Sequence, residues 1–312
     1  MKLSFVVPCY NEEENVELFY NEVVKTMKSK KIKYEIIFIN DGSKDNTIEV
    51  LKGIAKGSKE NVKIINFSRN FGKEAGMYAG LKEASGEYVS IIDADLQQRP
   101  STVLEMYDIL EENSNYDSVA AFQEKRKDPF FKKIFSQLFY KLINKISEVK
   151  FVDGASDFRL LRRNMVNAII DMSEYYRFSK GIFSFVGFNT YYIPYQADKR
   201  AHGTSKWSFW SLFKYAIEGI VSFTTAPLRI ATFFGIIISL FSFVYLIVLV
   251  CQTLILGIDV PGYASTLGAV LFLGGIQLFA LGIIGEYLGR TYVESKRRPI
   301  YITKEVIDSN KK

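Results

Sequence analysis

Glu87-Tyr-Val-Ser-Ile-Ile-Asp-Ala-Asp95 is a short apolar run that ends in two aspartates. At the end of a strand, residues i and i+2 point to the same side of the chain, so Asp93 and Asp95 can share one cation. Carboxylate oxygens suit hard divalent ions such as Mg2+ and Mn2+. The same pattern also occurs in ordinary turns and helix starts, so its significance depends on the residues around it.

The first 120 residues of the chain alternate apolar strands with helices. The predicted strands are residues 3–7, 34–39, 62–67, 88–92 and 118–122. The predicted helices are residues 13–29, 44–57 and 73–84, with another after Pro100. Near-continuous apolar strands separated by helices indicate an α/β fold, in which a mainly parallel sheet is covered by helices on both faces.

Polar side chains follow four of these strands, at the end where parallel sheets bind ligands. They lie in Pro8-Cys-Tyr-Asn-Glu12, Asn40-Asp41, Ser68-Arg-Asn70 and the Asp93/Asp95 pair. Pro8 lacks a backbone N–H and favours a turn. Tyr10 can flank a base, and Asp41 can accept a hydrogen bond from a nucleobase. We interpret Ser43 as the N-cap of the next helix, with Asp41 additional to that cap.

Composition narrows the class of protein further. The chain has 312 residues, a net charge of +6 and two cysteines, Cys9 and Cys251. The basic residues are dispersed, so we expect anionic lipid or phosphate partners and no nucleic acid. The cysteines form no disulfide framework, which fits a reducing cytoplasm. Residues 3–7 are too short for a signal peptide and are interpreted as a buried first strand.

Two segments have the pattern of helices that lie on a membrane surface. Residues 128–145 form a basic amphipathic pattern rich in phenylalanine, within a catalytic domain predicted to span residues 1–204. Residues 205–226 carry tryptophan and tyrosine, which favour the headgroup level. For each segment the alternative is a helix packed on the protein core.

Two uncharged runs within residues 227–289, at about 230–256 and 265–285, are long enough to cross the bilayer, which takes ~20 residues. Basic residues flank the outer ends of this pair, so both termini, including the tail at residues 290–312, are predicted in the cytoplasm. The protein is thus predicted to be a multi-pass protein of the inner (plasma) membrane. Gly285-Glu-Tyr-Leu-Gly289 suits close helix contact, within the hairpin or in a homo-oligomer.

Four motifs in this order resemble glycosyltransferase family two, which has the GT-A fold. They are Pro8-Cys-Tyr-Asn-Glu12, Asn40-Asp-Gly-Ser43, Arg69-Asn-Phe-Gly-Lys73 and Asp93-Ala-Asp-Leu-Gln97. With the two apolar runs, the chain is similar to the polyisoprenyl-phosphate glycosyltransferases, such as bactoprenol glucosyltransferases and dolichol-phosphate mannose synthases. The resemblance implies a nucleotide-sugar donor, a polyprenyl phosphate acceptor and Mg2+ or Mn2+.

The resemblance also implies roles for individual residues. Residues that border the nucleotide would be Pro8, Tyr10, Glu12 and Asp41. Asp93 and Asp95 would serve the diphosphate and the metal, with Asp95 the more direct ligand. Lys73 would assist the diphosphate, its alternative being a solvated lysine. Asp157, in Asp157-Phe-Arg-Leu160, matches the acid assigned as the acceptor-activating base; the alternative is a structural pair with Arg159.

The role of Asp157 as a base requires qualification. The acceptor is a phosphate monoester with a second pKa of ~6, so at cytoplasmic pH it is already mostly ionised. Asp157 is therefore expected to orient the acceptor or hold the metal as well. Arg177, Arg200 and Lys206 are the candidate cations for the acceptor phosphate, with Arg200 favoured because arginine can bind phosphate bidentately. His202 is the sole histidine and cannot build a metal cage alone.

The predicted reaction is transfer of one hexose, with glucose from UDP-glucose as the first choice, to undecaprenyl phosphate with inversion. Mannose, galactose, GlcNAc and aminoarabinose are alternatives that share these motifs. A processive polysaccharide synthase is disfavoured because no Gln-x-x-Arg-Trp motif occurs, and a non-catalytic scaffold is disfavoured by the intact acids. One departure from the family is Gln98-Arg99, where an acid or Asn followed by Pro is usual.

Overall fold

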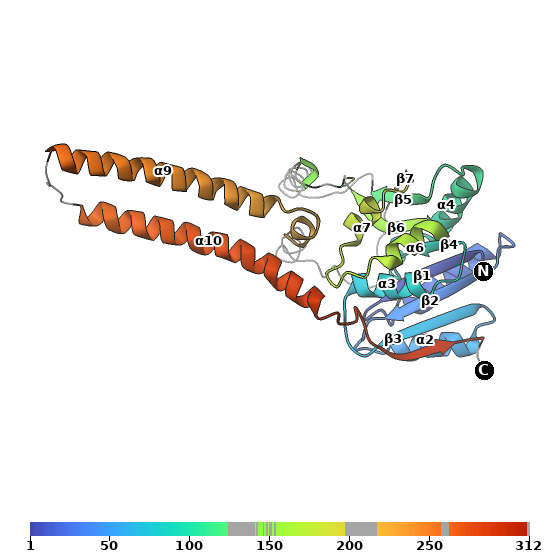
Figure 1. The fold of residues 1–312 in the computed structure, drawn as a ribbon. Helices are drawn as coiled ribbons and strands as arrows, with labels where there is room; N and C mark the ends of the chain where they lie inside the picture. The colour runs from blue at the N-terminus through green and yellow to red at the C-terminus, as the bar shows by residue number, and fades with distance from the viewer. Residues whose placement is uncertain are drawn as a thin grey trace. The chain divides into compact units, whose positions relative to one another are not determined.

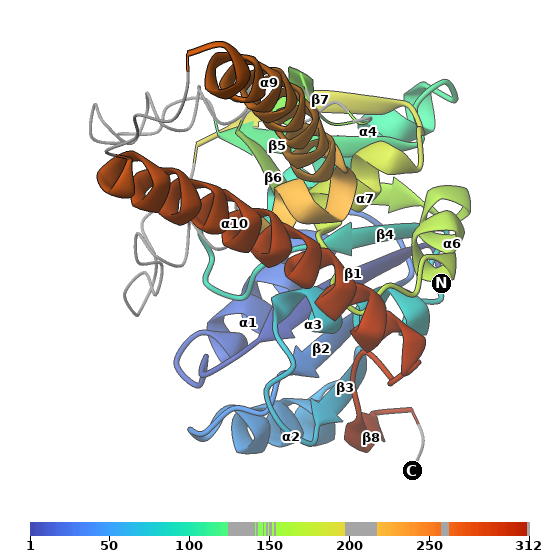
Figure 2. The same cartoon turned by 60° about the vertical axis from the view of Figure 1, so that its left-hand side comes forward.

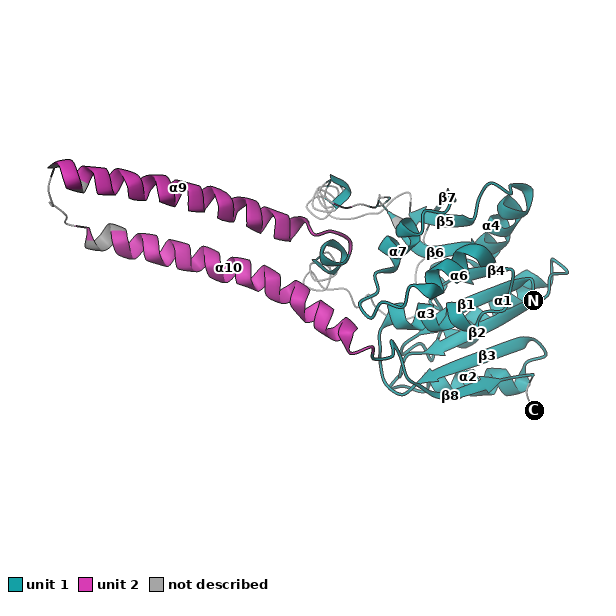
Figure 3. Ribbon diagram, viewed as in Figure 1, with its two compact units in different colours: residues 1–145, 149–222, 298–312 teal, residues 146–148, 223–297 magenta. Residues whose placement is uncertain are grey.

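A computed structural model describes residues 1–123, 141, 143–145, 147, 149, 152, 154–196, 217–256 and 262–310. The chain divides into two compact units (Figure 3). The first unit contains residues 1–145, 149–222 and 298–312, and the second contains residues 146–148 and 223–297. The predicted surface helices fall largely outside the described residues, which omit 128–140 and 205–216.

The first unit is built on an eight-stranded sheet with the order β7-β5-β6-β4-β1-β2-β3-β8 (Figure 1). The strands are β1 (Leu3–Cys9), β2 (Tyr34–Asn40), β3 (Asn61–Phe67), β4 (Tyr88–Ile91), β5 (Ser118–Gln123), β6 (Ala155–Arg162), β7 (Thr190–Tyr195) and β8 (Thr303–Asp308). The four central strands, β4-β1-β2-β3, are all parallel. This confirms the predicted parallel core.

Helices cover both faces of these central strands. The helices of the first unit are α1 (Val16–Met27), α2 (Thr47–Gly57), α3 (Lys73–Glu83), α4 (Pro100–Glu112), α6 (Arg163–Asp171) and α7 (Ser179–Phe185). Phe5 and Val7 of β1 share one core cluster with residues of α1, α2 and α4. Val6 points to the other face, where a Cβ on Gly80 of α3 would lie 2.2 Å from its Cγ1. Burial on both faces explains why these strands are continuously apolar.

The sheet is mixed toward its edges. β6 runs antiparallel to both β4 and β5, and β8 runs antiparallel to β3. Figure 2 shows β8 beside β3 at the edge of the sheet. The structure thus differs from the predicted tail at residues 290–312 and from a catalytic domain that ends at residue 204. Residues 303–308 belong to the same sheet as the N-terminal strands.

One helix start also differs from the prediction. α2 begins at Thr47 with Asn46 as its N-cap residue, so Ser43 is not the cap. The Ser43 hydroxyl instead donates to Asn40 Oδ1 at 2.5 Å. Residues 43–46 form a turn between the strand and the helix, and the Asp45 carboxylate accepts from the backbone N–H of Thr47 at 3.1 Å. The polar segment after β2 is therefore longer than predicted.

The second unit contains two long helices, α9 (Ala226–Leu256) and α10 (Tyr263–Ser295). Within them, residues 226–252 and 266–295 are long and apolar enough to cross a membrane, and none of the most apolar window is buried against protein. A core helix of a soluble protein would bury such side chains, whereas Leu254 and Leu278 are 80% and 71% exposed. The two predicted spans therefore coincide with helices of suitable length.

Candidate active site

The carboxyl ends of the four central strands meet at one edge of the sheet. The register pairs Cys9 with Asn40, Asn40 with Asn66, and Val6 with Ile91. Because these strands are parallel and in register at their ends, the segments that follow them lie next to one another. The predicted convergence of polar residues at this edge is confirmed for the loops themselves.

The loops after β1 and β2 are bonded to each other. The Asn11 backbone N–H donates to the Ser43 hydroxyl at 3.0 Å, and the Lys44 N–H donates to Asn11 Oδ1 at 2.8 Å. The Glu12 N–H donates to Thr47 Oγ1 at 2.9 Å. These contacts fix the segment after β1, and Pro8, Tyr10 and Glu12 in or next to it are all partly exposed. Their arrangement is compatible with the predicted nucleotide border.

Asp41 holds the loop that follows β3. Its buried carboxylate accepts hydrogen bonds from the backbone N–H groups of Phe71 at 2.6 Å and Gly72 at 2.9 Å. Burial raises the pKa of Asp41, although these two bonds and Arg69 oppose the rise. A carboxylate has about four acceptor positions, and these two bonds occupy two of them. The nucleobase contact stays a prediction, and the observed role is to position the loop.

Gly42 explains how closely these two loops approach. It has a φ of +61°, and a Cβ there would lie 2.3 Å from the Arg69 carbonyl carbon and 2.5 Å from the Asn70 nitrogen. A side chain at this position would collide with backbone, which cannot rotate away. Glycine is therefore required by both conformation and space.

Lys73 links two of the predicted site acids. Its Nζ lies 2.7 Å from Asp93 Oδ1 and 3.5 Å from Asp157 Oδ2. Desolvation alone would lower the pKa of Lys73, but the carboxylates of Asp93 and Asp157 raise it above its ordinary value. For Asp157, desolvation opposes ionisation, yet Lys73, Lys180 and Arg159 together lower its pKa. Lys73 and Asp157 therefore stabilise each other in their charged forms.

One oxygen of Asp157 remains available. Asp157 Oδ1 is buried and has no hydrogen-bond partner in the described part of the chain. The Arg159 guanidinium instead donates to the Ser156 carbonyl at 2.9 Å and lies 3.6 Å from the centre of the Phe183 ring. The alternative of a simple Asp157–Arg159 structural pair is therefore not supported. An unpaired buried carboxylate oxygen is costly unless a ligand uses it.

Gln98, the departure noted in the sequence, holds Asp93. Its Oε1 accepts from the Asp93 backbone N–H at 3.1 Å, and its Nε2 lies 3.4 Å from Asp93 Oδ2. Gln98 and Asp95 are both buried, and Asp95 Oδ1 accepts from the Gln97 N–H at 3.1 Å. The substitution relative to the family pattern therefore fixes the position of one acid of the pair.

Glu74 was missed by sequence reasoning. Its carboxylate accepts from the Ser179 backbone N–H at 3.0 and 3.2 Å and from the Ser179 hydroxyl. Burial and the charge of Asp157 raise the pKa of Glu74 to about 7, against the hydrogen bonds from Ser179 and the charge of Arg177. Glu74 and Ser179 are 105 residues apart in sequence, so no local signal joins them.

Of the three cations predicted to contact the acceptor phosphate, the structure describes only Arg177. The Arg177 guanidinium is buried, donates to the carbonyls of Met172 and Ile169 and lies 4.4 Å from the centre of the Tyr78 ring. It stabilises the end of α6, so this geometry does not support its predicted role at the acceptor phosphate. Arg200 and Lys206, like His202, lie outside the described residues.

The acid pair suits a divalent metal held jointly with a substrate. Among the described residues, no group of three or more His, Cys, Asp or Glu side chains forms a metal cage. Mg2+ is usually bound by one or two carboxylates together with substrate phosphates and water, without an all-protein cage. Asp93 and Asp95 at the loop after β4 provide such oxygen donors, so the residues fit the predicted Mg2+ or Mn2+.

Comparison with known proteins places this fold and hairpin among the glycosyltransferases, enzymes that transfer a sugar. Residues 4–170 match the model of Glycosyl transferase family 2, and residues 226–291 match the GtrB C-terminal hairpin. The first match covers more than half of the chain, and the chain therefore belongs to glycosyl transferase family 2. This confirms the resemblance inferred from the motifs.

Relatives of similar length support this assignment. The chain is 47% identical to the putative glycosyltransferase CsbB of Bacillus subtilis, over 99% of this chain and 93% of the relative. It is 43% identical to the bactoprenol glucosyl transferase of Shigella phage SfV, over 97% and 98%. It is 42% identical to the prophage bactoprenol glucosyl transferase homolog of Escherichia coli, over 98% and 99%.

Solved structures resemble the chain more remotely. A glucosyl-3-phosphoglycerate synthase from Mycobacterium tuberculosis, in complex with Mn2+, uridine diphosphate and phosphoglyceric acid, has 18% identity and a TM-score of 0.49. The likeness covers 70% of this chain and 76% of that one.

Proposed function

We propose that this glycosyltransferase transfers one hexose from a nucleotide sugar to a polyprenyl phosphate at the cytoplasmic face of the membrane. The observation that carries the proposal is the cluster of Asp93, Asp157 and Lys73 at the edge of a family 2 sheet, in a chain that also has a hairpin of apolar helices. The bactoprenol glucosyl transferases aligned above support the lipid acceptor, and glucose from UDP-glucose is the first candidate donor.

The donor would lie along the loops after β1, β2 and β3. Pro8, Tyr10, Glu12 and Asp41 would border the nucleotide, and Lys73 would neutralise the diphosphate. Asp93 and Asp95 would hold Mg2+ or Mn2+. When bound, the metal stabilises the negative charge that develops on the departing nucleoside diphosphate. Gln98 would keep Asp93 in position for this role.

The reaction would form one bond and break one bond at the sugar. An oxygen of the acceptor phosphate attacks C1 as the bond from C1 to the diphosphate oxygen breaks, and the nucleoside diphosphate leaves with the electron pair. Attack from the opposite face inverts the anomeric carbon. Because the acceptor is mostly ionised, Asp157 would orient it and take any remaining proton, with Arg200 and Lys206 as candidate phosphate contacts.

The membrane orientation follows from chain connectivity. The first unit contains residues on both sides of the hairpin in sequence, before residue 223 and after residue 297. If α9 and α10 each cross the bilayer once, the chain returns to the side it left. We therefore infer that both termini share one side, which the flanking basic residues assign to the cytoplasm.

The test uses purified full-length protein with Mg2+ or Mn2+, undecaprenyl phosphate and a panel of nucleotide sugars. Lipid products are identified by mass. We expect a product one hexose heavier than the lipid phosphate, and a loss of turnover of about 100-fold or more in Asp95→Asn, because a metal ligand supports several kcal/mol of charge stabilisation.

The matched control is Asp108→Asn, which removes a partly exposed acid of α4 paired with Lys30. This variant should retain activity. Equal turnover by Asp95→Asn and the parent protein would contradict the metal assignment, and no lipid-linked sugar from any donor would contradict the proposed function.

A further inference from the structure

The segment that follows α10 returns to the sheet and is tied firmly to β3. The antiparallel register pairs Lys63 with Asp308, Ile65 with Val306 and Phe67 with Thr303. Ser309 closes the pairing, because its N–H donates to the Val62 carbonyl at 2.9 Å and its hydroxyl accepts from the Val62 N–H at 2.9 Å. The segment is therefore an integral strand of the catalytic sheet.

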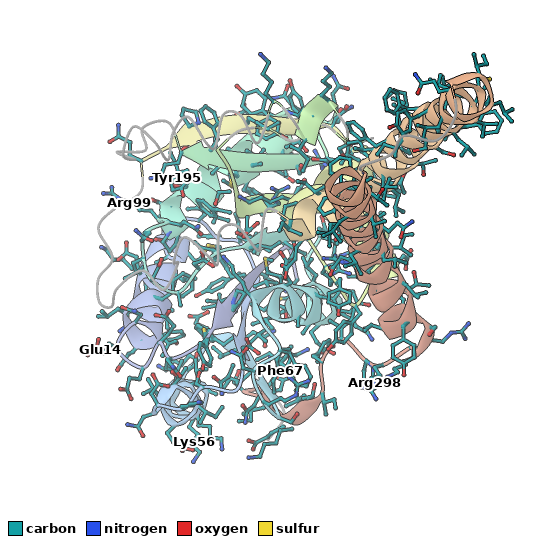
Figure 4. All side chains as sticks on the ribbon, turned by 90° about the vertical axis from the view of Figure 1, so that its left-hand side faces the viewer. Glu14, Lys56, Phe67, Arg99, Tyr195 and Arg298 are labelled. Carbon is teal, nitrogen blue, oxygen red and sulfur yellow. The ribbon has the colours of Figure 1, made fainter. Side chains whose placement is uncertain are left out.

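Its first residues reach past the strand, to the end of β3 that bears the site. The Ser68 N–H donates to the Ile302 carbonyl at 2.9 Å. The Tyr301 ring stacks on Phe67, labelled in Figure 4, with ring centres 4.8 Å apart and planes at 19°. Tyr301 also meets Tyr78 of α3 edge-on at 6.4 Å. It thus contacts the residue before the site loop and the helix after it.

That loop, residues 68–72, is supported from two sides. On the side of β2, the Asp41 carboxylate accepts hydrogen bonds from the N–H groups of Phe71 and Gly72. From the other side, Phe67 meets the Phe71 ring edge-on at 5.8 Å, and the Arg69 guanidinium lies 4.0 Å from the centre of that ring. Tyr301 braces Phe67, and Lys73 follows the loop immediately.

We propose that Tyr301 is a positioning residue for donor binding: through Phe67 and Phe71 it holds the loop that is bonded to Asp41 and leads into Lys73. The donor role of this loop rests on the proposed function, whereas the bracing itself does not. Loss of the Tyr301 ring would leave Phe67 unstacked at the sheet edge and free the outer side of the loop. The loop would then have to be ordered by the donor, which weakens donor binding.

The experiment compares Tyr301→Ala, Tyr301→Phe and the control Lys304→Ala, an exposed change on the same strand, in full-length protein. The first measurement, amide hydrogen exchange without ligand, follows the Phe71 and Gly72 amides. We expect exchange about tenfold faster or more in Tyr301→Ala, from the loss of an aromatic stack, and parental rates in Tyr301→Phe and Lys304→Ala. Tyr301→Phe should restore protection because it keeps the stacking ring.

The second measurement is the Michaelis constant for whichever nucleotide sugar of the panel is turned over. It should rise about tenfold in Tyr301→Ala, while kcat stays within about twofold, because the brace affects donor binding and not the reacting atoms. If no donor of the panel is used, the proposed function fails and hydrogen exchange alone still decides the role of Tyr301.

Exchange of the β1 amides reports whether the variant remains folded, and Tyr301→Leu replaces Tyr301→Ala if it does not. Unchanged protection of Phe71 and Gly72 in a folded variant would overturn the proposal. The same conclusion would follow if Tyr301→Phe behaved like Tyr301→Ala, or if kcat fell with no change in the Michaelis constant.

Discussion

Lys73 organises the charges of the site. Its side chain is 41% exposed, yet its ammonium lies between Asp93, in the loop after β4, and Asp157, in β6. Two carboxylates that approach one point repel each other, and a cation between them lowers that repulsion. The lysine therefore favours the charged form of Asp157, whose pKa it lowers.

Replacement of Lys73 by methionine should change the pH dependence of turnover. Lys73 lowers the pKa of Asp157, so its removal raises that pKa and protonates the acid at a higher pH. We expect the acidic limb of the kcat profile to move to higher pH in Lys73→Met. The control is Lys25→Met, which removes a surface lysine of α1 paired with Glu22. An unshifted acidic limb in Lys73→Met would show that Asp157 does not govern this titration.

Gln98 offers a second test at the level of one residue. Gln98→Ala removes both contacts to Asp93. The backbone N–H of Asp93 then loses the Gln98 Oε1 atom as its acceptor. The loss of a buried hydrogen bond costs about 1–3 kcal/mol, so we expect the Mg2+ concentration for half-maximal activity to rise roughly tenfold. Gln98→Asn, which introduces one of the residue types usual in the family, should lose less activity. Equal metal dependence in the parent protein and Gln98→Ala would refute this role.

At the level of elements, Glu74 joins the first turn of α3 to the first residue of α7 through Ser179. Its folded pKa of about 7 exceeds its ordinary value of 4.5, so the folded protein keeps a proton that the unfolded chain releases between these values. Stability must therefore fall as pH rises through this window, by at most about 3 kcal/mol, and the loss is complete above about pH 7.

Glu74→Gln should remove this dependence, because glutamine cannot ionise and still offers one acceptor oxygen to Ser179. We expect the melting temperature of Glu74→Gln, relative to the parent protein, to be higher at pH 8 than at pH 5. The matched change Glu22→Gln on the exposed side of α1 serves as the control. A constant difference between Glu74→Gln and the parent protein at the two pH values would contradict the buried titration.

The elements differ in how well their sequences predict them. Ile36, Ile37, Phe38 and Ile39 of β2 are all fully buried, and burial on both faces produces a continuous apolar run that a sequence reveals. β6 was missed because the charged residues Asp157 and Arg159 interrupt its apolar pattern. β8 has the sequence Thr-Lys-Glu-Val-Ile-Asp, in which half of the residues are charged. Charged residues are common in edge strands, so this segment has no apolar run that would predict a strand.

The site residues likewise differ in how well the sequence predicts them. Asp93 and Asp95 were predictable because a single strand end displays both of them. The role of Asp41 in holding the loop after β3, the contact of Glu74 with Ser179 and the stacking of Tyr301 on Phe67 all join distant parts of the chain. Such contacts arise from tertiary packing, which no local pattern encodes.

At the level of the whole molecule, the pairing of β8 with β3 makes membrane topology testable. Because residues 303–308 complete a sheet begun near the N-terminus, the C-terminal residues must lie on the same side of the membrane as the first unit. We expect a cysteine at Asn310 to react with a membrane-impermeant maleimide only from the cytoplasmic side. A cysteine at Gly262, before α10, should react only from the opposite side.

The labelling uses right-side-out and inside-out vesicles of a Cys251→Ser background, in which the remaining Cys9 is buried. Turnover of each variant confirms that its catalytic unit is folded. Reaction of both positions from one side would mean that α9 and α10 lie in the membrane without crossing it. Because β8 fixes the return of the chain, that result would exclude a spanning hairpin and leave the catalytic sheet intact.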